Sequence, residues 1–145
     1  MQIPSITTNK YKLLKFALLL GSVGWGISFY FTFTSWENST NQLYQMGATP
    51  IQYQPLLDYW LKMASSLFGG VGIIFFICYR NPAKYKTTIP LLCYPSILVG
   101  VVILSSALLN KLTLSIHPTY PADITFCFLV GISIIYSISN NLTNP

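Results

Sequence analysis

Four long apolar segments constrain this sequence more than any other feature. They cover residues 13–33, 56–79, 88–109 and 122–139. Each is close to the ~20 residues that a helix needs to cross a ~30 Å hydrocarbon layer. Backbone N–H and C=O groups cannot stay unpaired in lipid, so these segments are expected to be helical. We therefore predict an all-α fold, a bundle of four transmembrane helices, with residues 1–145 forming a single membrane domain.

The composition also points to lipid as the solvent. Hydrophobic residues make up 52% of the chain and charged residues 8%, whereas about 25% of a typical soluble domain is charged. The net charge of +5 comes from few side chains, too few for a surface that contacts many phosphates. We expect the bilayer as the main partner, with other membrane subunits or a second copy of the chain as further candidates, and no nucleic acid.

Basic residues predict the orientation of the bundle. Six of the eight precede the first crossing, lie at its start, or follow the second crossing: Lys10, Lys12, Lys15, Arg80, Lys84 and Lys86. The first and third connections hold only Lys111. Because loops rich in Lys and Arg stay in the cytoplasm, both termini are predicted to be cytoplasmic. The expected location is a membrane that the chain crosses several times.

Aromatic residues mark the opposite boundary. The residues expected to form an interfacial belt there are Trp36, Tyr53, Tyr59, Trp60 and Tyr120. The first extracytoplasmic connection is the long one, and its stretch 37–46 has the pattern of a short surface helix that stops at Gly47.

Small residues recur at helical spacing in the apolar segments. Such residues let helices approach closely in lipid, where the hydrophobic effect drives little association. The candidates for helix packing are Gly21, Ser22, Gly26, Ser65, Gly69, Gly72, Ser96 and Gly100. Two interpretations remain: contacts inside the bundle, or a face for a partner subunit.

Few residues of the sequence could act in catalysis or bind a metal or cofactor. Cys78, Cys93 and Cys127 all fall in apolar segments without a Cys-x-x-Cys pair, which favours small buried hydrophobes. His117 has no second ligand at useful spacing, so no haem or metal site is predicted. No catalytic motif such as Gly-x-Ser-x-Gly occurs. We expect no cofactor and no enzymatic activity.

Polar residues gather at the predicted outer boundary, where we expect Glu37, Asp58, Asp123 and His117. Asp58 and Lys62 are four residues apart, so they share a helix face and can pair. A charge held inside an apolar segment costs roughly 2.5–3.5 kcal/mol on insertion scales and therefore calls for a partner.

The pair has two interpretations. It is either a gate, relay or anion-binding group in an outward-facing cavity, or a structural salt bridge with Lys62 reaching toward the headgroups. Asp123 has a structural explanation of its own, because it follows Pro121 at a helix start, where a carboxylate caps free N–H groups. For His117 we predict a solvent-exposed position in the loop.

Several stretches resemble a group of small bacterial inner-membrane proteins with four helices. They are Asp58-Tyr-Trp-Leu-Lys-Met-Ala, the run from Gly72 through Arg80-Asn-Pro-Ala-Lys-Tyr, Ile89-Pro-Leu-Leu, and Asp123-Ile-Thr-Phe-Cys-Phe with Gly131. The resemblance spans the last two-thirds of the chain. It implies four helices and a bacterial membrane setting, and because the group has no assigned activity, it identifies no functional residue.

Two functions follow as hypotheses. The first is a non-catalytic integral membrane protein, standing alone or serving as an accessory or structural subunit of a larger membrane complex. The second is a small transporter or channel that uses an outward-facing polar cluster around Asp58, Lys62 and Asp123.

Overall fold

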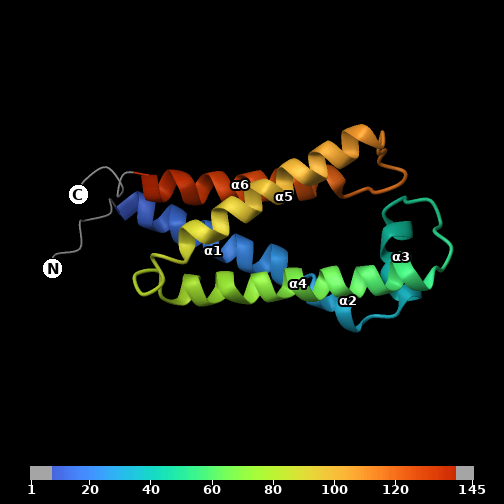
Figure 1. The fold of residues 1–145 in the computed structure, drawn as a ribbon, viewed down its shortest axis with the longest axis horizontal. Helices are drawn as coiled ribbons and strands as arrows, with labels where there is room; N and C mark the ends of the chain where they lie inside the picture. The colour runs from blue at the N-terminus through green and yellow to red at the C-terminus, as the bar shows by residue number, and fades with distance from the viewer. Residues whose placement is uncertain (1–7, 140–145) are drawn as a thin grey trace.

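The computed structural model describes residues 8–139, and within them the secondary structure is helical with no strand (Figure 1). The helices are α1 (Thr8–Gly26), α2 (Phe29–Phe33), α3 (Trp36–Gln45), α4 (Pro55–Arg80), α5 (Ile89–Leu109) and α6 (Tyr120–Ile138).

In this described part of the chain, four spans are long and apolar enough to cross a membrane: Asn9–Phe33, Pro55–Arg80, Ile89–Leu109 and Tyr120–Ile138. They agree with the four predicted segments to within a few residues at most ends. The fourth begins at Tyr120 rather than Ala122, because the helix starts directly after the connection that contains Pro118. The all-helical fold with four candidate membrane spans is thus confirmed.

The first span is interrupted, where the sequence predicted one continuous helix. At Ile27 and Ser28 the backbone tightens: the Ser28 N–H donates to the Trp25 carbonyl (3.2 Å) and the Tyr30 N–H to the Ile27 carbonyl (3.1 Å). These bonds join residues three apart, as in a 3₁₀ turn. The break directly follows Gly26, and glycine favours the helix less than most residues.

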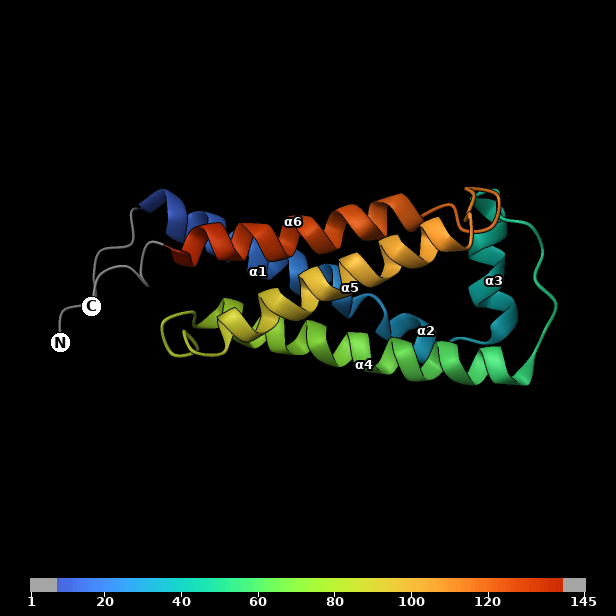
Figure 2. The same ribbon diagram turned by 45° about the horizontal axis from the view of Figure 1, so that its top comes forward.

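Helix α1 lies between two of the other long helices. It packs against α4 on one side and α6 on the other, while α5 packs on α6 and α2 packs on α4. Figures 1 and 2 show α5 crossing obliquely from the α4 side of the bundle to the α6 side.

The two ends of the bundle differ in charge. At one end α1 begins, α6 ends and the connection 81–88 turns (Figure 1). Lys10 lies 5.0 Å from the ring centre of Tyr136 on α6, and Lys15 lies 5.0 Å from that of Tyr79 on α4. Cations over aromatic rings at this end link α1 to both of its neighbours.

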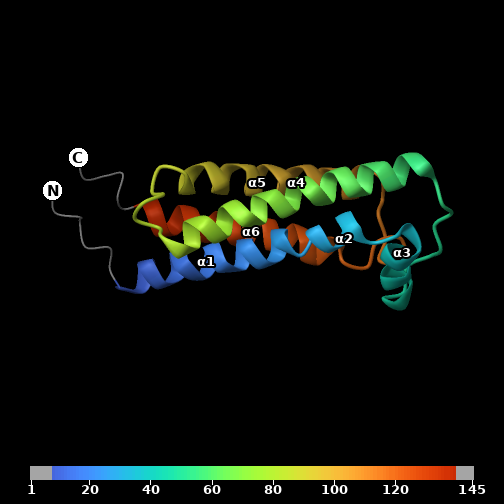
Figure 3. The same cartoon turned by 90° about the horizontal axis from the view of Figure 1, so that it is seen from below.

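At the other end α3 stands across the bundle (Figures 2 and 3). Ser35 begins this helix by accepting a hydrogen bond from the Asn38 N–H (3.3 Å), and Gly47 follows its end with a φ of +98°, which glycine adopts without strain. The Thr49 N–H donates to the Ser115 carbonyl (2.7 Å), so the connections before α4 and before α6 meet at this end.

The core lies mostly toward the basic end. Its fully buried side chains include Leu18, Phe75, Cys78, Cys93 and Ile134. Cys127 is also buried, so the prediction that the three cysteines act as small buried hydrophobes is confirmed. The bundle is therefore closely packed in one half, and the candidate site lies in the other.

Small residues allow the closest helix contacts. A methyl group on Gly72 would overlap the backbone of Gly26, one on Gly69 would overlap the ring of Phe29, and one on Gly21 would overlap Phe75. Of the remaining candidates, Ser65, Ser96 and Gly100 are buried, whereas Ser22 is partly exposed. For most of these positions the geometry supports contacts inside the bundle.

Replacing Gly72 with alanine is expected to destabilise the bundle, because the new methyl group would force α4 away from the backbone of α1. The matched control is Gly70→Ala on the same helix, where a methyl group meets no atom within 4 Å. We expect a lower thermal unfolding midpoint in detergent for Gly72→Ala only. The Gly70 variant should be unchanged or slightly more stable, since alanine favours helix by up to about 1 kcal/mol. Equal midpoints for the two variants would contradict the close crossing.

Candidate functional site

The first polar pair joins two residues of α4. Lys62 Nζ lies 2.9 Å from Asp58 Oδ2, which confirms the pairing expected from their spacing. The Asp58 side chain is 18% exposed and the Lys62 side chain 42% exposed. Within the described residues, the other carboxylate oxygen of Asp58 is buried without a hydrogen-bond partner. Among the described residues, Lys62 is the cation that pairs with this carboxylate.

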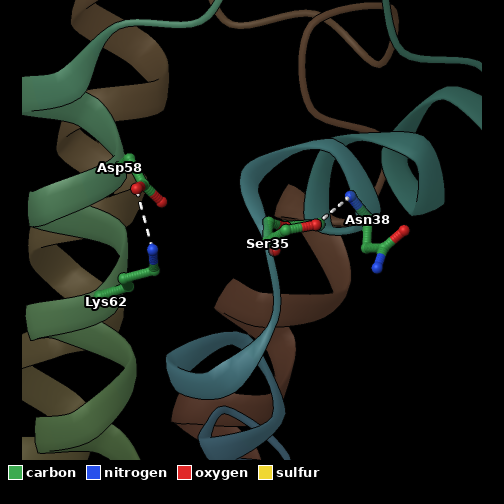
Figure 4. Close-up of polar contacts among 5 residues, drawn as sticks. Ser35, Asn38, Asp58 and Lys62 are labelled. Carbon is green, nitrogen blue, oxygen red and sulfur yellow. Dashed lines mark hydrogen bonds and ion pairs between the residues drawn. The ribbon is translucent and has the colours of Figure 1, made fainter.

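The surroundings of the pair come from α2 and the start of α3. Figure 4 shows both side chains leaving α4 on the side that faces Ser35. One turn further on, the Ser66 hydroxyl donates to the Lys62 carbonyl (2.8 Å) and lies 3.3 Å from the Thr32 hydroxyl on α2. The pair thus lies one turn along α4 from the hydrogen bond that joins this helix to α2.

The second polar cluster lies at the start of α6. His117 Nε2 lies 3.5 Å from Asp123 Oδ2, and the Thr119 hydroxyl donates to the same carboxylate oxygen (3.2 Å). The Thr119 hydroxyl also lies 3.3 Å from His117 Nδ1. Because the three side chains come from the last turn of the connection and the first turn of α6, the start of the helix brings them together.

The prediction that Asp123 caps backbone N–H groups is wrong. In the first turn of α6 its carboxylate contacts the side chains of His117 and Thr119 instead. His117 lies in the connection with its side chain 42% exposed, as predicted, but its contact with Asp123 was not foreseen.

A cavity of about 430 Å³ opens between the helices in this half of the bundle. It is lined by α1, α4, α5 and α6 together with the connection before α6. Its inner wall is mostly apolar, with Val99, Ile103 and Ile124 among the lining residues. His117 and Asp123 also line it, so the second cluster forms the polar part of its wall.

Aromatic rings form much of the cavity wall. Trp25 packs against Phe68 with ring centres 5.0 Å apart and against Phe126 at 5.6 Å, and all three residues line the cavity together with Tyr120. Gly24 makes room for this arrangement, because a methyl group there would overlap the Phe126 ring.

The structure therefore separates the predicted polar cluster into two pairs. Asp58 and Lys62 are not among the residues that line the cavity, while His117 and Asp123 are. Glu37 lies exposed in the first turn of α3. Sequence reasoning missed Thr119 and Trp25 as members of the site. Thr119 was detectable in principle, four residues before Asp123, whereas the role of Trp25 depends on its tertiary neighbours.

Within residues 8–139, no group of three His, Cys, Asp or Glu side chains is placed to hold a metal ion. Comparison of the chain with protein-family models, curated proteins and solved structures found no match in any of the three.

Four apolar helices of membrane-crossing length, with large side chains such as Phe16, Leu98 and Ile132 exposed along them, indicate a multi-pass membrane protein in contact with the bilayer.

Replacing Lys62 with methionine is expected to lower the thermal unfolding midpoint in detergent. The change leaves the Asp58 carboxylate without its cation, a loss of about 1–2 kcal/mol, less than for a fully buried pair because Lys62 is partly solvated. The double variant Asp58→Asn, Lys62→Met should regain most of that loss. As a control, Lys111→Met removes an exposed lysine and should have little effect. A double variant as unstable as the single one would show that the pair does not contribute in this way.

Proposed function

We propose that this chain is a non-catalytic integral membrane protein that acts through contacts within the bilayer, as an accessory or structural subunit of a larger membrane complex. The observation that most supports this proposal is the share of the chain that lies in the membrane spans. The four membrane spans contain most of the described residues, and even the longest segment between two of them, 34–54, holds only the short helix α3 and its flanking loops. A chain of this kind has little material outside the membrane with which to build a soluble catalytic domain.

The proposed orientation places both termini in the cytoplasm. In support, the basic residues near the start of α1, the end of α4 and the connection 81–88 lie at one end of the bundle, and α3 lies at the other. In this orientation α3 lies at the outer surface of a bacterial cytoplasmic membrane. The exposed rings of Tyr53, Tyr59 and Trp60 then lie near the outer headgroups, as interfacial aromatic residues do.

A transporter built on Asp58, Lys62 and Asp123 has less support. Asp58 pairs with Lys62 outside the cavity lining, and of the three residues only Asp123 lines the cavity. A gate would need the groups to face one another along a common path.

The orientation can be tested by labelling single introduced cysteines with a membrane-impermeant maleimide. Ala83→Cys in the basic connection should react only after the cells are permeabilised, whereas Leu114→Cys in the connection before α6 should react in intact cells. Both positions are exposed, neither change removes a basic residue, and the three native cysteines are buried. The unmodified protein serves as the background control. Labelling of Ala83→Cys in intact cells would overturn the orientation.

The subunit role can be tested by extraction in a gentle detergent followed by native mass measurement. We expect the 16.3 kDa chain to travel with other membrane polypeptides in a complex of larger mass. Harsher detergent should release it as a monomer, which provides the internal control. If the chain is a monomer under every gentle condition, the subunit role is wrong.

A further inference from the structure

The cavity combines an aromatic wall with a single acidic side chain. Four of its lining residues are Trp, Tyr or Phe, namely Trp25, Phe68, Tyr120 and Phe126. Among the described residues of the lining, Asp123 is the acidic one and none is Lys or Arg. His117 Nε2 lies 3.5 Å from one oxygen of this carboxylate.

The charge is also available to a ligand. Asp123 is 51% exposed on its side chain, and both of its contacts, from His117 and from Thr119, fall on Oδ2. Within the described residues, Oδ1 has no hydrogen-bond partner. A carboxylate whose second oxygen is unused, at the edge of an apolar space, can pair with a positive group.

From this geometry we propose that the cavity binds a lipophilic organic cation, such as a quaternary ammonium or phosphonium with aromatic or alkyl substituents. Aromatic rings attract such cations through their negative faces, and the effect grows when the cation is desolvated. The carboxylate adds a Coulomb attraction that apolar walls strengthen. The volume of about 430 Å³ falls in the range of small-molecule sites.

Charge discriminates between this ligand class and others that would fit an apolar space. An anionic lipid headgroup would meet the Asp123 carboxylate with like charge, and none of the described residues that line the cavity is a Lys or Arg that could offset it. A neutral hydrocarbon would leave Oδ1 of the carboxylate without a partner. A cation can contact the faces of the aromatic rings and can also pair with the carboxylate.

The test compares two ions of the same shape and opposite charge. The full chain is purified in a neutral detergent, and binding of radiolabelled tetraphenylphosphonium and of tetraphenylborate is measured by equilibrium dialysis against protein-free micelles. We expect saturable binding of the phosphonium and much weaker binding of the borate. Equal binding of the two ions would overturn the proposal, because it would mean that only hydrophobicity is recognised.

Two pairs of matched variants locate the binding. Asp123→Asn should weaken phosphonium binding at least about tenfold by removing the charge, whereas Glu37→Gln, the same change at an exposed residue of α3, should not. Ser106→Phe should weaken binding by filling space in the cavity, whereas Ser105→Phe, its exposed neighbour outside the lining, should not.

Each variant is first checked for an unchanged helical circular dichroism spectrum, and the two pairs are independent, so the loss of one variant to misfolding leaves the other pair decisive. Unchanged phosphonium affinity in a folded Asp123→Asn or Ser106→Phe variant would place any binding elsewhere on the molecule. None of these readouts depends on the mass of the complex, so the outcome is separate from that of the subunit proposal.

Discussion

The bundle depends on the crossing of α1 and α4, where Gly72 approaches the backbone of Gly26 without an intervening side chain. In a bilayer, moving an apolar side chain from lipid into a protein interior changes its surroundings little, so helices associate through close packing instead. On the same helix, Gly69 packs against the ring of Phe29, which begins α2 directly after the break in the first span. The two glycines of α4 therefore hold α1 close and also leave room for the first ring of α2.

The two halves of the bundle are packed differently. Toward the basic end the helices bury Leu18, Phe75, Cys93 and Ile134 completely, and cations rest on aromatic rings across helix boundaries. Toward the α3 end the space between helices is not filled, and a cavity with an aromatic wall and one carboxylate remains. A well-packed half can hold the helices in place while the other half keeps an open site.

Local interactions were the most predictable part of the candidate site. The Asp58–Lys62 pair follows from a spacing of four residues on one helix, which needs no knowledge of the fold. The contact of His117 with Asp123 was missed because it depends on how the connection before α6 turns back, and Pro118 lies inside that turn. The break at Ile27 was missed because an apolar segment with several glycines matches a continuous span equally well in hydropathy.

The number of membrane helices and their approximate limits could be read from the apolar segments, because the cost of unpaired backbone groups in lipid leaves one local solution. Which helices touch could not be read in this way, because small residues occur in all four spans and offer many possible faces. The three-dimensional packing alone placed α1 between α4 and α6 and separated the acidic residues into two sites. It also left Trp25, Phe68 and Phe126 around a cavity, since rings from different helices share a wall only after the helices have assembled.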